Sequence, residues 1–298
     1  MAAGHDRQDQ GAGHRRGRPR REHGDGLQAH APGSINLPEV HPSALVHPTA
    51  ELGVGTVVGP FAIVEAGVVL GEGCRVEAMA TVRTGTVMGV RNVVGQGAVL
   101  GGDPQDTKFQ GEPTFLQIGD DNTFREYVTV HRATGEGAST VVGNRNYIMA
   151  YCHLGHNVTL MDEVVIASHT GISGHVTIEG RANIGGMTGI HQWARIGKVA
   201  MVGGMSRIVR DVPPYMIVEG EDAVVHDINA VGLRRMGITQ QGRLALHKAC
   251  KLLFKSQLGL RNAMEIVRRE VSMTPEVEYL LTFEERRYQG KNGRGDQV

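Results

Sequence analysis

The chain has 298 residues, a formal net charge of zero and 42 glycines, whereas aromatic residues make up only 4%. The length allows one large domain or two smaller ones, and the balanced charge gives no reason to expect nucleic acid or an anionic membrane surface as a partner. The three cysteines are too few and too scattered for a disulfide framework or a zinc knuckle, which favours a reducing, cytoplasmic compartment. No apolar run approaches the ~20 residues of a membrane span, so we expect none.

Residues 1–34 contain the polar, basic stretch GHRRGRPRREHGDG and lack the apolar run of a secretory signal. We interpret this segment as a disordered leader of mixed charge. An over-long start or a remnant of cloning is an equally open alternative, so the segment carries no functional argument.

Aliphatic residues recur at every sixth position from Val46 onward, and the run from Val142 to Ile208 holds twelve of them in succession. This period fits neither an isolated helix nor a hairpin. It is typical of parallel strands that coil around an axis, with one hexapeptide on each side of the coil. Three sides make a coil of eighteen residues, stacked on the next coil at about 4.8 Å. We therefore predict a mainly β protein with a parallel β-helix over residues 35–220.

Two polar segments interrupt the repeat, GGDPQDTKFQGEPTF after Leu100 and HRATGEGAST after Val130, and we expect both to project as binding loops. After RDVPPY the six-residue period ends. From GEDAVVHDINAVGLRRMG onward the apolar residues follow helical spacing. We predict a C-terminal helical domain over residues 221–298 that covers the otherwise open strand edges at that end of the β-helix.

The eighteen-residue coil places His156, Gly174 and Gln192 in one column along a single face. His153 ends one hexapeptide and His156 sits in the middle of the next side, so the two histidines flank a corner. Three more histidines lie beside this column or at the second interruption: His131, His175 and His191. Five histidines and a bare glycine backbone are therefore expected to converge on one stretch of surface.

Three interpretations of this cluster differ in the chemistry they require. A metal site would need three imidazoles directed at one point, which a spread along a column does not favour. Histidines on the outside of a solenoid can also be plain polar surface, and His169 fits that interpretation. His156 fits acyl transfer better, because its imidazole can take a proton from an alcohol while the Gly174 N–H stabilises the developing oxyanion. Such a reaction needs no metal ion and no cofactor.

The motifs GGDPQDTKF, VTVHRAT, HLGHN, GGMTGIHQ and DVPPY, in this order, resemble those of the UDP-N-acetylglucosamine O-acyltransferases that begin lipid A synthesis, across roughly residues 40–290. The resemblance implies a left-handed β-helix and a homotrimer with active sites between subunits. It also implies transfer of an (R)-3-hydroxyacyl chain from acyl carrier protein to the 3-hydroxyl of UDP-N-acetylglucosamine.

Carried over by motif, the resemblance makes His156 the general base and Gly174 the donor of the oxyanion N–H. Asp106 and Lys108 in the first interruption match contacts to the sugar and the acyl donor. Gly204 matches a gauge of acyl-chain length, where a glycine leaves the groove open. The other matched positions line the pocket or contact substrate and carrier: His131, His153, His175, His191, Gln192, Asn229 and Arg235.

Three residues depart from the pattern of the family. Asn157 follows the base, where Asp is frequent, and an amide can orient the imidazole but cannot stabilise an imidazolium with a full charge. Val231 and Met236 stand where some members carry Glu and Arg. The sequence therefore leaves open whether the accepting sugar carries a 3-hydroxyl or a 3-amino group.

Other hexapeptide-repeat proteins are the alternatives. The N-acyltransferase of the same pathway shares the repeat and the histidine base, but it normally has an N-terminal globular domain, for which the residues here are too few and too polar. An acetyl-CoA-dependent acetyltransferase fits less well with the basic segment GLRRMG, which suits an acidic protein donor. Two further alternatives are not acyltransferases at all: a zinc-dependent β-helix hydratase and a non-catalytic trimeric scaffold.

Overall fold

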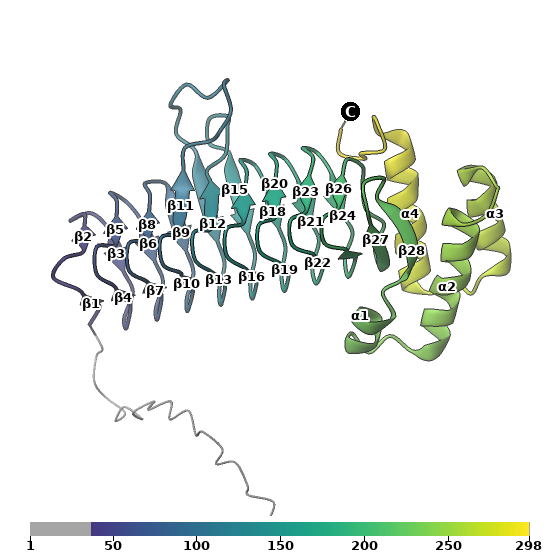
Figure 1. The fold of residues 1–298 in the computed structure, drawn as a ribbon, viewed down its shortest axis with the longest axis horizontal. Coiled ribbons are helices and arrows are strands. Elements are labelled where there is room, and N and C mark those ends of the chain that lie inside the picture. Colours follow the sequence, from purple (N-terminus) through teal and green to yellow (C-terminus); the bar gives the residue numbers. More distant parts are fainter. Residues whose placement is uncertain (1–36, 298) are drawn as a thin grey trace, which may run out of the picture. The chain divides into compact units, whose positions relative to one another are not determined.

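The computed structural model describes residues 37–297, and the predicted leader at residues 1–34 lies outside the described residues. Residues 37–297 form a β-helix of short strands followed by helices (Figure 1). The strands make three sheets, which we name A, B and C. The predicted fold class, a mainly β protein with a parallel β-helix and C-terminal helices, is confirmed.

Each sheet takes one strand from nearly every coil. Sheet A contains β1 (Glu39–Val40), β4 (Val57–Val58), β7 (Arg75–Val76), β10 (Val93–Val94), β13 (Thr123–Phe124), β16 (Tyr147–Ile148), β19 (Val165–Ile166), β22 (Asn183–Ile184), β25 (Met201–Val202), β27 (Met216–Glu219) and β28 (Val224–Ile228). Sheet B contains β2 (Leu45–Val46), β5 (Ile63–Val64), β8 (Thr81–Val82), β11 (Val99–Gly102), β14 (Thr129–His131), β17 (His153–Leu154), β20 (Gly171–Ile172), β23 (Gly189–Ile190) and β26 (Arg207–Ile208). Sheet C contains β3 (Glu51–Leu52), β6 (Val69–Leu70), β9 (Thr86–Met88), β12 (Phe115–Ile118), β15 (Ser139–Val142), β18 (Thr159–Leu160), β21 (Thr177–Ile178) and β24 (Arg195–Ile196).

Parallel pairing between coils keeps an eighteen-residue register outside the two interruptions. In sheet B, for example, His153 pairs with Gly171, and Gly171 pairs with Gly189. In the two-residue strands from β4 onward, the second residue points to the axis, where Ile172 and Ile190 are buried. The aliphatic residues at period six are therefore the core, and residues eighteen apart lie in one outward or inward column.

Both interruptions leave the coil as loops (Figure 1). The first joins β11 to β12, and the second joins β14 to β15. The Gly135 N–H donates to Glu112 Oε1 at 2.9 Å, which ties the second loop to the first. Strand β12 still pairs in parallel with β9 before it and β15 after it. The coils therefore continue to stack past the loops, with a register shift between β11 and β14 at Leu100 and Gly102.

The C-terminal part continues from β28 through α1 (Ala230–Arg235), α2 (Gln240–Phe254), α3 (Leu260–Glu270) and α4 (Pro275–Gln289). The helical segment predicted from residue 221 starts later, because Val224–Ile228 forms an antiparallel strand on the edge of β27. The edge of β27 would otherwise present unpaired N–H and C=O groups. The hydrogen bonds that pair them stabilise a strand here more than the helical spacing of so short a segment favours a helix. Among the helices of residues 37–297, none has the length and apolar character of a membrane crossing.

A buried carboxylate joins α4 to the last coils of the β-helix. Glu179 is 2% exposed and accepts hydrogen bonds from Arg195 Nε at 2.6 Å, from Lys198 N at 2.8 Å and from the Tyr279 hydroxyl at 2.7 Å. Burial, together with the neighbouring Glu179, raises the pKa of Tyr279 to about 12, so this hydroxyl remains a donor. The helical domain is thus docked on the β-helix through the buried Glu179 carboxylate, which is hydrogen-bonded by its three donors.

Replacing Glu179 by alanine is expected to lower the free energy of unfolding by about 3–5 kcal/mol, because Arg195 loses its closest carboxylate in a half-buried place. Glu285 on α4 is the matched control, since it pairs with Arg268 at the surface and its loss is expected to cost about 0–1 kcal/mol. Urea unfolding of both variants measures the difference. Equal, small losses would show that α4 docks without this network.

Candidate active site

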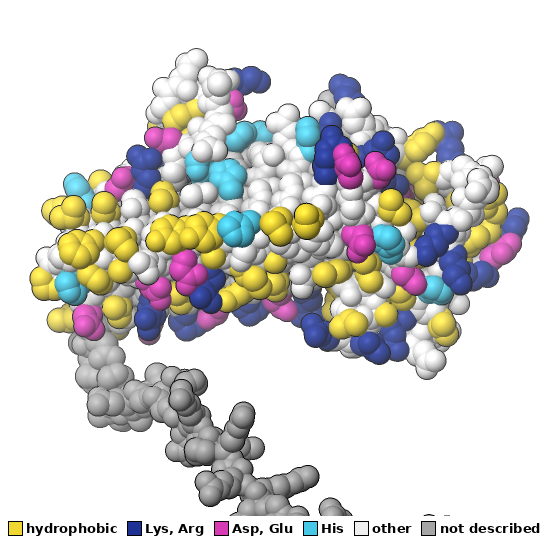
Figure 2. Space-filling view, viewed as in Figure 1, with side chains coloured by type: hydrophobic (Ala, Val, Ile, Leu, Met, Phe, Trp, Pro, Cys, Tyr) yellow, Lys and Arg dark blue, Asp and Glu magenta, His cyan; other side chains and the backbone are white. Residues whose placement is uncertain are grey.

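Sheet B forms the floor of a groove of about 590 Å³ on the outside of the β-helix. The floor is the column of first residues of β17, β20, β23 and β26, which are His153, Gly171, Gly189 and Arg207. The corners that follow these strands contribute His156, Gly174, His191 and Gln192. Histidine side chains gather at the foot of the projecting loops (Figure 2).

His156 and Gly174 are neighbours in adjacent coils, as the eighteen-residue register predicts. A Cβ on Gly174 would lie 2.5 Å from Nε2 of His156, so a larger residue would displace the imidazole. The Gly174 N–H donates no hydrogen bond within the described residues, which leaves it available beside the ring. The prediction that His156 lies in the middle of a side is wrong: the strands here have only two residues, and His156 belongs to the corner after β17.

Asn157 fixes the orientation of the His156 ring. Its Oδ1 lies 2.8 Å from His156 Nδ1. The same oxygen accepts the Thr134 N–H at 2.9 Å, and Asn157 Nδ2 donates to the Thr134 carbonyl at 3.2 Å. Because these two bonds fit only one orientation of the amide, its oxygen faces Nδ1, which carries the proton. Nε2 is then the unprotonated nitrogen, next to Gly174, where a general base needs it.

Two further histidines stand near His156 as neutral groups. His153 Nδ1 lies 2.9 Å from the Thr129 hydroxyl oxygen, and burial lowers the pKa of His153 to about 4. Burial also lowers the pKa of His131, whose ring meets that of His153 edge to face, with 4.9 Å between centroids. Both imidazoles are therefore uncharged at neutral pH; within the described residues, Nδ1 of His131 is buried without a hydrogen-bond partner.

His175 meets the His156 ring edge to face, with 5.2 Å between centroids. Burial lowers the pKa of His175, and its ring stacks on Trp193 at 3.9 Å. Both residues occupy corners with positive φ, one coil apart, so their rings lie directly above one another. Trp193 was not predicted from the sequence, although an eighteen-residue step from His175 leads to it.

The first loop brings Asp106 and Lys108 close to His156 within one chain. Asp106 Oδ1 accepts the Lys108 N–H at 3.0 Å, and this bond, with smaller contributions from nearby His156 and Lys108, holds the pKa of Asp106 below its usual value. Gln105 of the same loop lines the groove. Asp106 therefore stays an anion that can accept hydrogen bonds from sugar hydroxyls.

Two family models match the chain: Bacterial transferase hexapeptide (six repeats) over residues 139–174, and Udp N-acetylglucosamine O-acyltransferase, domain 2, over residues 211–295. The acyl-[acyl-carrier-protein]--UDP-N-acetylglucosamine O-acyltransferase of Halorhodospira halophila is 42% identical, over 83% of this chain and 96% of the relative. The protein of the same name from Thermodesulfovibrio yellowstonii is 39% identical, over 85% and 98%. The chain belongs to the UDP-N-acetylglucosamine O-acyltransferase family.

Solved structures of UDP-N-acetylglucosamine acyltransferases have the same fold. The protein from Bacteroides fragilis matches with a TM-score of 0.79 and 34% identity, over 82% of this chain and 96% of that chain. The Arabidopsis protein matches with a TM-score of 0.74 and 32% identity, over 85% and 98%. The family resemblance inferred from the sequence motifs is confirmed.

Asn229 and Arg235, which the family resemblance places in the substrate site, lie apart from His156 in this chain. They line a second groove, of about 610 Å³, formed by sheet A and α1. Val231 and Met236, the two departures from the family pattern, line the same groove. A single O-acyltransferase chain therefore carries two separate groups of predicted site residues, one on sheet B and one on sheet A.

Asn229 has a structural role that the sequence did not reveal. It caps α1, because its Oδ1 accepts the Gly232 N–H at 2.9 Å. Its Nδ2 donates to the Val199 carbonyl at 2.9 Å. Both ends of the Asn229 amide are therefore already hydrogen-bonded within the chain, and any contact with a substrate would be made in addition to these bonds.

Gly204 lies in the corner between β25 and β26. A Cβ on Gly204 would lie 3.3 Å from the Gly186 carbonyl oxygen, a close but not impossible contact. A side chain at position 204 is therefore sterically accessible and would extend outward from the corner.

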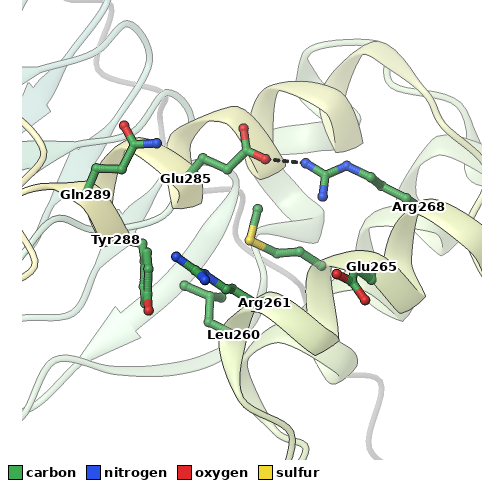
Figure 3. A pocket seen from close by; sticks show the side chains of 8 residues that line it. Leu260, Arg261, Glu265, Arg268, Glu285, Tyr288 and Gln289 are labelled. Atoms are coloured by element: carbon green, nitrogen blue, oxygen red, sulfur yellow. Dashed lines mark hydrogen bonds and ion pairs between the residues drawn. The ribbon is translucent and has the colours of Figure 1, made fainter.

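A third cleft, of about 510 Å³, lies between α3 and α4 (Figure 3). Arg268 and Glu285 form an ion pair there, and the Arg261 guanidinium lies 5.2 Å from the centre of the Tyr288 ring. None of the residues predicted for the site lines this cleft. Because it lies away from His156 and contains none of the predicted residues, we assign it no part in the chemistry.

Proposed function

We propose that this chain catalyses the first step of lipid A biosynthesis, the transfer of an (R)-3-hydroxyacyl chain from acyl carrier protein to the 3-hydroxyl of UDP-N-acetylglucosamine. Relatives that are 39–42% identical over most of the chain carry this enzyme name. The observation that supports the mechanism is the His156 imidazole beside the bare Gly174 backbone. Because acyl carrier protein and nucleotide sugars are cytoplasmic, we also propose a cytoplasmic location.

In this mechanism, His156 Nε2 takes the proton of the sugar 3-hydroxyl as that oxygen attacks the thioester carbonyl carbon. The carbonyl oxygen becomes an oxyanion, and the Gly174 N–H donates to it. When the tetrahedral intermediate collapses, the carbon–sulfur bond breaks and the proton held by His156 passes to the leaving thiolate. Asn157 keeps the ring oriented, but its amide stabilises the transient imidazolium only as a dipole.

The groove has the length and charge for an extended acyl donor. Its floor from His153 to Arg207 spans three coil steps, about 14 Å at ~4.8 Å each. A Cβ on Gly171 or Gly189 would meet nothing within 4 Å, so the middle of the floor is bare backbone. Arg207 and Arg210, at the far end, form no ion pair within residues 37–297. This positive charge suits the phosphate-linked arm and acidic surface of a carrier protein.

An exposed row of side chains runs along the corner between sheets A and B. We name it the A/B ridge; it consists of Phe61, Met79, Tyr127, Tyr151, His169, Met187 and Met205. Tyr151 stacks on Tyr127 at 5.1 Å and on His169 at 5.0 Å. A row of hydrophobic side chains along the β-helix is visible in Figure 2. A largely apolar exposed surface of this kind is typical of a protein–protein contact.

The two grooves lie on the two sheets that meet at the A/B ridge. Three copies arranged around an axis beside the ridge would bury it and place sheet B of each copy against sheet A of the next. The His156 groove of one subunit would then face Asn229 and Arg235 of its neighbour. We therefore propose a homotrimer with three composite active sites.

Replacing His156 by alanine is expected to lower kcat by about 10²-fold or more, because the general base is lost. His226, which is exposed and outside both grooves, is the matched control for a histidine-to-alanine change. Mass analysis of the product from UDP-N-acetylglucosamine and a set of hydroxyacyl carrier proteins measures the activity. Near-normal turnover of a folded His156→Ala trimer would refute the base, and no product from the unaltered protein with any donor would refute the function.

Mixing subunits tests the composite site. Arg235→Ala and His156→Ala chains are each expected to be nearly inactive alone, whereas randomly mixed trimers should hold intact sites at about a quarter of the interfaces. Asp106→Ala mixed with His156→Ala is the matched negative control, because both residues belong to the same groove of one chain. If verified subunit exchange restores activity in neither mixture, or only in the control, the arrangement is wrong.

We also propose that Gly204, beside the A/B ridge, sets the length of the acyl chain and leaves room for a long one. Gly204→Met is expected to shift the preference to shorter chains, because each excluded methylene loses about 0.8 kcal/mol of burial. Gly204→Ala is the graded control and should shift it less. Competition between short and long hydroxyacyl donors measures the ratio of products. Unchanged selectivity in a folded, active Gly204→Met enzyme would rule out the gauge.

A further inference from the structure

The C-terminal segment reaches the groove of His156 through one arginine. Arg294 is 7% exposed, and its Nη1 lies 2.9 Å from Nδ1 of His191 at the edge of the groove. The same Nη1 donates to the Val209 carbonyl at 3.1 Å, and Nε donates to Gln297 Oε1 at 2.8 Å. A guanidinium has donors only, so its contact with His191 is a hydrogen bond only if Nδ1 carries no proton.

A second group competes for the same nitrogen. The Gln192 carbonyl oxygen lies 3.0 Å from His191 Nδ1, and a hydrogen bond between them would require a proton on Nδ1. Gln192 is exposed, so its carbonyl can be hydrated instead. The guanidinium of Arg294 is buried, so water cannot replace its acceptor in the same way. If Nδ1 of His191 carried the proton, Nη1 of Arg294 would face an N–H group and not an acceptor. Nδ1 of His191 therefore accepts from Arg294, and the proton of the neutral ring is on Nε2.

The residues around Arg294 are held in place by contacts with the last coil of the β-helix. The Gly295 N–H donates to Asp211 Oδ2 at 2.7 Å, and the Asp211 N–H donates to the Gly293 carbonyl at 2.9 Å. Arg195 pairs with Asp296 at 3.3 Å. The C-terminal segment thus packs beside the end of the β-helix (Figure 1), and the position of the guanidinium is fixed by the fold.

We propose that Arg294 is a positioning residue for the acyl donor. It holds His191 as the Nε2–H tautomer, so that the groove presents an N–H donor to a carbonyl or hydroxyl oxygen of the donor arm. Without Arg294, Nδ1–H would bond to the Gln192 carbonyl, and Nε2 would face the groove as an acceptor that repels such an oxygen.

The position of His191 indicates which kinetic constant responds. His191 lies two coil steps beyond the corner of His156, about 10 Å along the axis. That distance is beyond the reacting thioester, so the N–H of His191 binds the donor arm and does not take part in the chemical step. The identification of the bound group as the arm of the acyl donor rests on the proposed function; the tautomer of His191 does not.

The tautomer is tested without any activity measurement. In protein labelled with ¹⁵N-histidine, the His191 signals, assigned with His191→Gln, are expected to show a protonated Nε2 and an unprotonated Nδ1. Arg294→Met should reverse this pattern, and Arg294→Lys, which keeps a donor, should retain it. Arg269→Met, on the exposed end of α3, is the control for loss of an arginine. A protonated Nδ1 in the unaltered protein, or an unchanged pattern in folded Arg294→Met, would overturn the proposal.

Kinetics then test what the tautomer does. Arg294→Met is expected to raise KM for the acyl carrier donor roughly three- to tenfold, the loss of one hydrogen bond, with kcat within about twofold. Arg294→Lys should restore KM. A fall in kcat at constant KM, or equal KM increases in both variants, would overturn the positioning role. Should Arg294→Met not fold, Arg294→Gln and the tautomer of the unaltered protein decide the question. Absence of acyl transfer would refute the proposed function and leave the tautomer result standing.

Discussion

The backbone hydrogen bonds between successive coils are the constraint on which the rest of this molecule depends. They stack each residue on the one eighteen positions later, for example Gly171 on His153, at the spacing of neighbouring strands. The size of a side chain in one coil therefore limits the residue in the next. His156 can lie flat beside the next coil only because that coil presents Gly174. The His156 imidazole and the Gly174 N–H are thus brought together by the register itself.

The same stacking divides the groove into a neutral part and a charged part. Burial lowers the pKa values of His131, His153 and His175, so the rings around His156 add hydrogen bonds but no charge at neutral pH. Asn157 continues this pattern, since an amide stands where a carboxylate is frequent in the family. Arg207 and Arg210, which form no ion pair within residues 37–297, lie three coils away, beyond the bare glycine floor. In the proposed mechanism, proton transfer and recognition of an anionic donor are therefore separated along one axis.

The features that follow directly from the six-residue period could be predicted from the sequence. The buried aliphatic column through Ile172 and Ile190 and the stacking of Gly174 on His156 both follow from counting. The strand β28 was not predicted, because five residues are too few to separate alternating from helical spacing and its pairing depends on the free edge of β27. The corner position of His156 was also missed, since the period gives the step between sides but not the lengths of strand and corner.

Contacts between distant parts of the chain could not be read from any local pattern. Asn229 was matched to a substrate contact, but its role as the cap of α1 depends on Val199 in the last coils. Arg294 and His191 are 103 positions apart, and only the docking of the C-terminal segment on Asp211 brings them together. Such pairs follow from tertiary packing, which a repeat rule does not contain.

The placement of the two grooves bears on the geometry of the proposed trimer. The first groove is built on β17, β20, β23 and β26 of sheet B, and the second on β19, β22 and β25 of sheet A. Strands β19, β22 and β25 belong to the same coils as β20, β23 and β26. Two surfaces at nearly the same height along a solenoid are brought face to face by pure rotation about a parallel axis. Rotation about the A/B ridge is therefore the arrangement that joins sheet B to sheet A without sliding one subunit along another, and it buries the apolar row in the same step.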